Sequence, residues 1–261
     1  MSSGPAILTP AYYERLETLE KRHWWCRSVR RVGLHLVEPL VPGAGALLDA
    51  GCGTGGFLAA FETRNPAARG VGADVSFDAL SRARANGVRP LIGASVDALP
   101  FASGRFDVVV SNDVLQHLPA GRDERCLAEA WRVLKPGGFL CLRANLGDPV
   151  QPHPGLARRY DRRALARLVR EAGFVIRKHL LLHPLAALWS DLRGPRAAEH
   201  AEGGHGLALS LPPAPLNAAM DAYGRIEDAV VRRLPFVLPR GDAQVLLARK
   251  PGRYTPPAAD E

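Results

Sequence analysis

The sequence predicts an α/β protein with a Rossmann-like, doubly wound sheet of seven strands. From Gly45 onward, short apolar runs alternate with amphipathic runs, which is typical of β-α-β units around a mostly parallel sheet. A glycine-rich turn at residues 51–55 joins the first apolar run to the first amphipathic run. With 261 residues, of which 47% are hydrophobic, the chain can bury one large core.

The apolar spacing places each element in order. The expected strands are residues 46–50, 70–75, 89–93, 106–111, 138–143, 174–181 and 243–248. The expected helices between them are residues 56–63, 77–85, 114–118, 122–133 and 162–172. In the helix from Arg122, apolar residues recur at helical spacing until the Pro136-Gly137-Gly138 turn ends it.

Two segments fall outside this alternation. Residues 1–44 are expected to form an N-terminal helical cap with two helices over residues 11–40 and His23-Trp24-Trp25 near their junction. These aromatic residues either clamp the helices onto the domain or close over a substrate. Residues 45–250 form the main domain, and a Pro/Ala-rich tail at residues 251–261 is expected to be flexible.

A long insertion precedes the last strand. It spans about residues 182–242, where a short connection is usual, and contains helical patterns at residues 184–192 and 215–230. The insertion is either a lid that binds substrate or a packing appendage.

Composition narrows the class of protein. No apolar run approaches the roughly 20 residues of a membrane-spanning helix, residues 1–10 do not resemble a secretory signal, and we expect a cytoplasmic protein. The four cysteines lack metal-ligand spacing, so neither a metal site nor a disulfide is expected. Residues 151–261 hold 17 basic and 11 acidic side chains. This excess of positive charge suits binding to an acidic substrate, an anionic membrane surface or nucleic acid. Alternatively, the basic side chains only form a solvated surface.

The glycine turn alone fits two kinds of cofactor. Gly51, Gly53 and Gly56 satisfy the dinucleotide fingerprint, and Asp74 lies where such a fold places its ribose-binding acid. Three features argue against a dinucleotide. The carboxylate of Asp49 would repel a pyrophosphate but suits the cationic amino group of a methionine moiety. The apolar strand and polar end of residues 106–118 and the LKPGG turn at residues 134–138 are the other two.

Several motifs in one order then resemble a known family. DAGCGTG (49–55), LPF (99–101), FDVVVS (106–111), VLQHL (114–118) and LKPGG (134–138) together are similar to class I S-adenosylmethionine-dependent methyltransferases. The resemblance covers roughly residues 45–172, and residues 244–250 match the final antiparallel strand of that family. The segment His23-Trp24-Trp25 looks similar to members associated with polysaccharide or lipid tailoring.

The resemblance implies S-adenosylmethionine as the cofactor and assigns its contacts. Gly51, Cys52, Gly53 and Gly55 would hold the methionine part, with Asp49 nearby. Asp74 would accept hydrogen bonds from both ribose hydroxyls. Its alternative role is to cap a helix or stabilise a turn. Ser95 and the Val96 backbone would recognise adenine, and Asn112 would lie at the same site. Ser95 stands where the family usually has aspartate, which leaves the role of Asp97 open.

Methyl transfer from a sulfonium needs alignment more than acid-base chemistry. If the acceptor is a hydroxyl, His117 is the candidate general base, and its alternative role is packing. Asn112 and Asp113 end the fourth strand, where ligands bind in such sheets, or they cap the next helix. Arginines at positions 158, 159, 162 and 163 either grip an acidic group of the acceptor or are solvated.

The expected acceptor is a small or lipid-linked molecule, and O-methylation is the first hypothesis for the reaction. Nucleic-acid binding is not expected, because no reading element or stacking aromatic residues accompany the basic residues, whereas peripheral membrane contact stays open. A nicotinamide-dependent oxidoreductase and a non-catalytic, cofactor-binding member of the fold are the alternatives.

Overall fold

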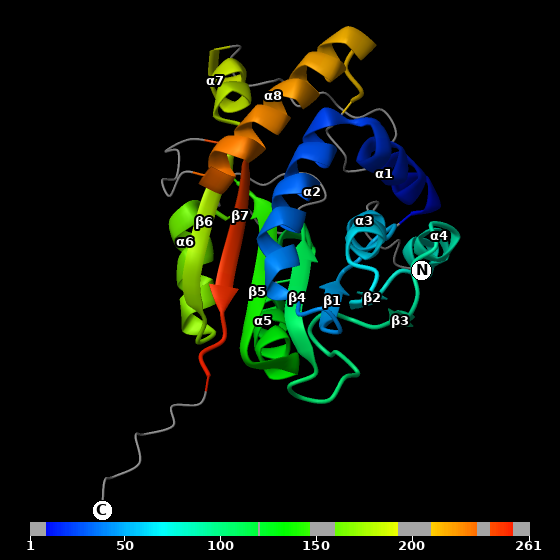
Figure 1. Ribbon diagram of the computed structural model, residues 1–261, viewed down its shortest axis with the longest axis vertical. Helices are drawn as coiled ribbons and strands as arrows, with labels where there is room; N and C mark the ends of the chain where they lie inside the picture. The colour runs from blue at the N-terminus through cyan, green and yellow to red at the C-terminus, as the bar shows by residue number, and fades with distance from the viewer. Residues whose placement is uncertain (1–8, 120, 147–159, 193–209, 234–240, 253–261) are drawn as a thin grey trace, which may run out of the picture.

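The computed structural model describes residues 9–119, 121–146, 160–192, 210–233 and 241–252. Its centre is a single seven-stranded sheet in the order β3-β2-β1-β4-β5-β7-β6 (Figure 1). The strands are β1 (Ala46–Ala50), β2 (Arg69–Asp74), β3 (Leu91–Gly93), β4 (Phe106–Asn112), β5 (Leu134–Asn145), β6 (Val175–Leu182) and β7 (Ala243–Arg249). Strand β7 pairs antiparallel with both β5 and β6, whereas the pairs among β1 to β5 are parallel. The predicted fold class is confirmed, including the antiparallel last strand.

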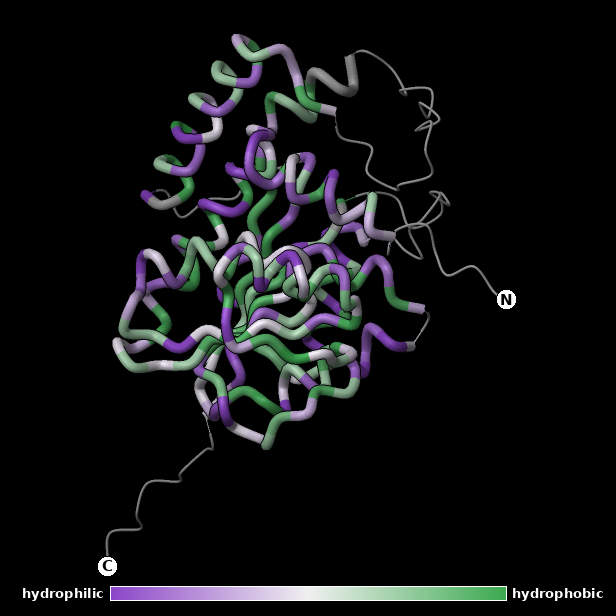
Figure 2. The backbone as a smooth tube through the Cα atoms, turned by 90° about the vertical axis from the view of Figure 1, so that its right-hand side faces the viewer, coloured by the Kyte–Doolittle hydropathy of each residue, from purple (hydrophilic) through white to green (hydrophobic). Residues whose placement is uncertain are grey.

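Helices cover both faces of the sheet. They are α1 (Pro10–Arg22), α2 (Trp24–Val37), α3 (Gly56–Arg64), α4 (Phe77–Ala85), α5 (Arg122–Val133), α6 (Arg162–Glu171), α7 (Pro184–Leu192) and α8 (Ala214–Arg233), with 3₁₀ turns η2 (Glu38–Leu40) and η3 (Leu115–His117). Neighbouring residues of β1 enter different cores: Leu48 packs on the side of α5 and α6, and Leu47 on the side of α2 and α3. Both faces of the strands are therefore buried, as in other parallel sheets, and Figure 2 shows hydrophobic residues concentrated there.

Two elements differ most from the sequence-based expectation, while the bounds of the others shift by three residues or fewer. The helix expected at residues 114–118 is only the 3₁₀ turn η3. Strand β5 begins four residues earlier than expected, because Leu134 pairs with Phe106 before a register shift. Gly137, at φ 82°, lies within this early part of the strand.

The insertion is attached to the N-terminal helices. Figure 1 shows α8 beside α2, and Asp221 of α8 forms ion pairs with Arg27 and Arg31 of α2 at 3.1 and 3.0 Å. The two helices approach so closely that a Cβ on Gly224 would lie 2.6 Å from Oγ of Ser28. Helix α8 is thus held against α2, the second of the N-terminal helices.

Within the described ranges, the structure contains no helix with both the length and the apolar character that crossing a bilayer requires.

Candidate active site

The glycine turn leaves the carboxyl end of β1 and enters α3, and its backbone requires glycine. Gly51, Gly53 and Gly55 have φ angles of 82°, 53° and 77°, in the left-handed region that side chains disfavour. Space is also restricted, because a Cβ on Gly51 would lie 2.3 Å from Cγ2 of Val114. The carbonyl oxygen of Ala73 accepts the N–H of Gly51 at 2.7 Å. The turn therefore exposes backbone rather than side chains, and contacts with β2 and with the loop after β4 hold it in place.

Cys52 continues this arrangement at the centre of the turn. Its N–H donates to the carbonyl oxygen of Ala73 at 3.0 Å, and its side chain is buried. A Cβ on Gly72 would lie 3.0 Å from its Sγ, so the thiol faces β2. Only the backbone of Cys52 is then suited to contact a ligand.

Asp74 connects the end of β2 to the glycine turn. Its Oδ2 accepts the N–H of Gly53 and its Oδ1 accepts the N–H of Ser76, both at 2.9 Å. Burial raises the pKa of this carboxyl, against the opposing effect of these hydrogen bonds. The side chain that caps α4 is that of Ser76, which accepts the N–H of Ala79 at 3.3 Å. A carboxylate has about four acceptor sites, so Asp74 keeps acceptor capacity for a ligand hydroxyl beside these backbone donors.

Asp49 is a buried carboxyl without a full set of partners. It is 2% exposed, and its Oδ1 has no hydrogen-bond partner among the residues that the structure describes. Burial, together with the neighbouring carboxylates of Glu20 and Asp74, raises the pKa of Asp49 to about 7. Three acidic groups thus surround the glycine turn, which favours a positively charged ligand there.

The segment after β3 is fixed by an ion pair. Arg122 donates to both carboxylate oxygens of Asp97, at 2.5 and 2.8 Å, and the Ser95 hydroxyl donates to Asp97 at 2.5 Å. The hydrogen bond from Arg122 lowers the pKa of Asp97 to about 2. The side chain of Val96 is buried in the core. Ser95 therefore retains acceptor capacity on its oxygen, and Val96 offers only its backbone, so adenine recognition by these residues stays a prediction.

The carboxyl end of β4 carries a strained acidic residue. Asp113 has a φ of 57°, and its Oδ2 lies 2.5 Å from Nη2 of Arg143 on β5. Its Oδ1 is buried and lacks a hydrogen-bond partner in the described part of the chain. Asn112, the last residue of β4, is half-buried and pairs in register with Arg143. The end of β4 thus brings polar groups to the edge where β1 ends.

His117 ends the 3₁₀ turn η3 in the same loop. Its backbone N–H donates to the carbonyl oxygen of Val114, the residue that packs on Gly51. The His117 side chain is half-buried. The loop therefore connects His117 to the glycine turn through Val114, and the general-base role stays a prediction.

The N-terminal helices lie over the turn. The Thr54 hydroxyl donates to the carboxylate of Glu20 on α1, and burial raises the pKa of Glu20. A Cβ on Gly53 would lie 3.9 Å from Leu16. Tyr13, which is 4% exposed, also faces this region, because Asp74 and Ser76 both influence its pKa, which burial raises to about 12.

The aromatic pair at the helix junction connects two regions. Trp24 is buried, and its ring contacts that of His183 in an edge-to-face arrangement with centroids 5.0 Å apart. The indole of Trp25 donates to Asp242 at 3.1 Å and lies 5.6 Å from the guanidinium of Arg143. Trp24 thus packs against the insertion, while Trp25 faces the end of β5.

Sequence reasoning missed the contribution of α1. Glu20, Leu16 and Tyr13 lie on one face at helical spacing, but an amphipathic face does not reveal which part of the fold it covers. Arg143 was missed for the same reason, since its partner Asp113 lies 30 positions away. The four arginines after residue 157 divide into two groups: Arg162 and Arg163 lie on α6, and positions 158 and 159 fall outside the described residues.

Comparison with known proteins agrees with this geometry. Residues 48–142 match the family described as "Methyltransferase domain". A curated C-methyltransferase of ubiquinone and menaquinone biosynthesis from Syntrophotalea carbinolica is 35% identical over 157 residues, which are 56% of this chain and 60% of the relative. The chain thus spans less than two thirds of that relative's length.

Solved structures share the fold. An S-adenosylmethionine-dependent methyltransferase of Thermotoga maritima superposes with a TM-score of 0.58 at 19% identity, over 92% of this chain and 97% of the other. Geranyl diphosphate C-methyltransferase of Streptomyces coelicolor has a TM-score of 0.56 at 17% identity, over 83% and 76%. Residues 48–142 thus match a methyltransferase domain, and the chain has the fold of these solved structures.

Proposed function

We propose that this protein transfers the methyl group of S-adenosylmethionine to a small or lipid-linked acceptor. The observation that carries the proposal is the Oδ1 atom of Asp49, which is buried, has no hydrogen-bond partner among the described residues, and lies beside a turn whose glycines carry no side chain. An ammonium group at this oxygen would satisfy the carboxylate and compensate its burial. The cofactor has such a group in its methionine part.

The other predicted contacts fit the rest of the cofactor. The turn from Gly51 through Cys52 and Gly53 to Gly55 presents backbone to the methionine part. The remaining acceptor capacity of the Asp74 carboxylate suits the ribose hydroxyls. Ser95, the Val96 backbone and Asn112 are assigned to the adenine side and the strand end. These assignments rest on the position of each residue at the carboxyl edge of the sheet.

A nicotinamide dinucleotide fits this site less well. The carboxyl groups of Glu20, Asp49 and Asp74 influence one another electrostatically, so an anionic pyrophosphate at the turn would meet three acidic groups. A cationic cofactor instead lowers the free energy of the same cluster. The cluster therefore favours the methyltransferase over the oxidoreductase.

The chemical step depends mainly on orientation. When bound, the cofactor supplies a methyl group on a positively charged sulfur, which leaves as a neutral thioether. The protein must hold the acceptor in line with this group and keep water away. For a hydroxyl acceptor, we assign proton removal to His117, next to the end of β4. O-methylation is the reaction that gives this histidine a role.

The nature of the acceptor follows from the surroundings of the site. The helices α1 and α2 cover the turn, and α8 is bound to α2 by ion pairs, which suits an enclosed site for a small molecule or the head of a lipid-linked one. The named neighbour that methylates geranyl diphosphate acts on a small acceptor. The four free thiols suit a reducing compartment such as the cytoplasm.

Titration calorimetry with S-adenosylmethionine and S-adenosylhomocysteine tests cofactor binding. We expect saturable binding of both ligands and no binding of NADH. Mass spectrometry of a cell extract incubated with methyl-labelled cofactor then identifies the acceptor without assuming its class. Absence of cofactor binding at millimolar concentration would reject the proposal, and binding without any labelled product would favour a non-catalytic member of the fold.

The variant His117→Ala tests the mechanism. We expect a 10²- to 10⁴-fold lower kcat, with unchanged affinity for the cofactor, because His117 is assigned to the acceptor. Unchanged turnover would show that the acceptor atom needs no base, as for a carbon or carboxylate nucleophile.

A further inference from the structure

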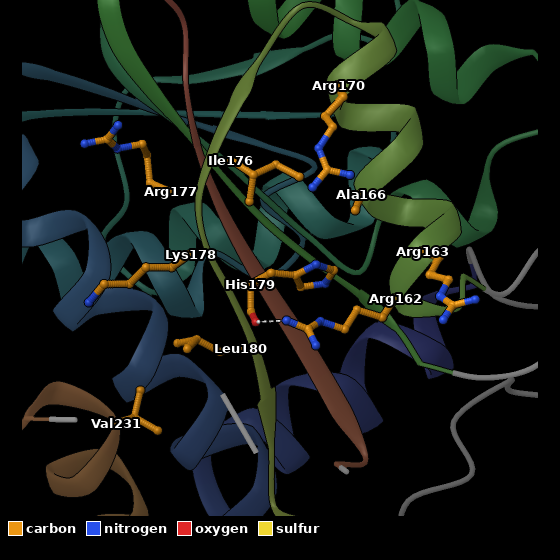
Figure 3. Close-up of a pocket in the computed structure, with 10 residues that line it drawn as sticks. All are labelled: Arg162, Arg163, Ala166, Arg170, Ile176, Arg177, Lys178, His179, Leu180 and Val231. Carbon is orange, nitrogen blue, oxygen red and sulfur yellow. Dashed lines mark hydrogen bonds between the residues drawn. The ribbon is translucent and has the colours of Figure 1, made fainter. Parts of the chain in front are cut away.

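A concave surface lies at the edge of the sheet opposite to β3. It is a groove of about 540 Å³ along β6, the edge strand that three strands separate from β1. Its cationic side chains are Arg162, Arg163 and Arg170 from α6, and Arg177 and Lys178 from β6 (Figure 3). Among the described residues that line it, none is acidic.

Among the residues that the structure describes, the groove cations differ from several other arginines in lacking a carboxylate partner. Arg122 and Arg143 form close ion pairs with aspartates, and Arg167, on the same helix α6, lies 3.9 Å from Glu171. Within the described part of the chain, no ion pair joins any of the five groove cations to a carboxylate. Their mutual repulsion is therefore not neutralised by neighbouring side chains.

Edge strands often carry charged side chains that prevent pairing with another strand, which would explain Arg177 and Lys178. It does not explain the arginines of α6. Figure 3 shows the side chains of Arg162 and Arg170 directed toward β6, whereas those of Arg177 and Lys178 leave the strand on its other side. Positive charge thus flanks the free edge of β6 on both sides.

His179 shows that this charge reaches the interior. It is 7% exposed, its Nε2 lies 3.0 Å from Oε1 of Gln244, and its carbonyl oxygen accepts from Arg162 at 3.5 Å. Burial lowers the pKa of His179, and the charges of Arg162 and Arg170 lower it further. An anion in the groove would offset these two charges and raise the pKa again.

We propose that the groove binds a ligand with at least two phosphate groups. A guanidinium matches two oxygens of a phosphate. Arg162 and Arg170 are eight residues apart, which corresponds to about 12 Å along the helix, so a single phosphate cannot contact both in this way without drawing their side chains together. Free diphosphate compounds and the headgroups of an anionic membrane share this chemistry.

Calorimetry with inorganic pyrophosphate at low ionic strength tests the site, with inorganic phosphate for comparison. We expect saturable binding of pyrophosphate, at least tenfold tighter than that of phosphate, and weakened by added salt. The double variant R162Q/R170Q should lose at least tenfold in pyrophosphate affinity. The matched control R167Q removes an arginine from the same helix outside the groove and should bind as the unmodified protein does.

Several measurements separate the outcomes. Nuclear magnetic resonance should show a higher pKa for His179 with pyrophosphate, in the unmodified protein only. Vesicles of phosphatidylcholine with and without phosphatidic acid distinguish a membrane from a free ligand as the source of phosphate. Equal losses in R162Q/R170Q and R167Q, or retention on an RNA oligonucleotide that pyrophosphate does not displace, would overturn the proposal. Cofactor affinity is measured on the same variants, so that failure here is separate from failure of the proposed methyl transfer.

Discussion

The Oδ2 atom of Asp74 accepts the backbone N–H of Gly53 at 2.9 Å. This hydrogen bond joins the end of β2 to the turn that follows β1, so the residue assigned to the ribose also fixes the turn assigned to the methionine part. A change at Asp74 should therefore affect cofactor binding in two ways, through a lost ligand contact and through a looser turn.

For Asp74→Ala, we expect a loss of about 1.5–3 kcal/mol in the free energy of cofactor binding, the range for hydrogen bonds to a charged group. Calorimetry measures this loss. The variant Asp74→Asn is the control, because its single amide oxygen can accept one of the two N–H groups and should recover part of the loss. Full affinity in Asp74→Ala would show that the ribose lies elsewhere.

The glycine turn provides a test of its own geometry. Gly51→Ala should destabilise the fold by more than about 2 kcal/mol, because it adds both left-handed strain of about 1–2 kcal/mol and a Cβ 2.3 Å from Val114. Gly87→Ala is the matched control, since Gly87 has a φ of 88° but no atom within 4 Å of the added Cβ. Urea unfolding of both variants measures the difference. Equal losses would mean that Val114 moves aside without cost.

These positions show what the sequence could reveal. The glycine turn, Asp49 and Asp74 were predictable because each lies at the carboxyl end of an apolar strand or directly after it. Local spacing alone therefore places them at one edge of a parallel sheet. The antiparallel last strand was recognised from a family resemblance. The short turn η3 was not predicted, because the pattern of residues 114–118 suits a helix, and the closeness of Val114 to Gly51 is a contact that this pattern does not reveal.

The contacts of the N-terminal helices with the site and with the insertion could not be predicted in the same way. The contact of Glu20 with Thr54 joins residues 34 positions apart, and that of Trp25 with Asp242 joins residues 217 apart. Such contacts depend on how helices dock, which periodicity does not encode. The groove along β6 was visible in sequence only as a run of arginines, half of which lie outside the described residues.

Asp49 should make both stability and cofactor binding depend on pH. Its pKa of about 7 in the folded protein exceeds the unfolded value near 3.9. The folded state therefore holds this proton more tightly, so the stabilising contribution is complete below about pH 4 and is lost as the pH rises through 7. Asp49→Asn should abolish this dependence and be more stable than the unmodified protein at pH 8, by on the order of 4 kcal/mol. Urea unfolding at pH 5 and pH 8 measures it.

Cofactor binding should have the opposite pH dependence. An ammonium group prefers the charged carboxylate, so the affinity of the unmodified protein should fall as the pH is lowered below 7, by up to tenfold per pH unit. Asp49→Asn should bind weakly at every pH, without this slope. A similar slope in both proteins would assign the titration to another group, such as Glu20.

Variants at Asp221 distinguish a fixed support from a mobile lid for α8. Asp221 is 5% exposed. The variant Asp221→Ala removes its ion pairs with Arg27 and Arg31, and this loss should lower the free energy of unfolding by about 1–3 kcal/mol. Arg225→Ala is the control, because it removes only an exposed partner of the same carboxylate and should cost less than about 0.5 kcal/mol. Thermal unfolding measures both.

Hydrogen exchange then tests the motion directly. If α8 is a support, its amides should be as protected as those of α2, with or without cofactor, and Asp221→Ala should lower protection in both helices together. A lid must instead open to admit the acceptor, so its amides should exchange faster than those of α2 and become protected only when ligands bind. The ion pairs of Asp221 and the close approach of Gly224 to Ser28 both oppose separation of the two helices. We therefore expect α8 to exchange as a support, with α2, and the acceptor to enter elsewhere along the carboxyl edge of the sheet.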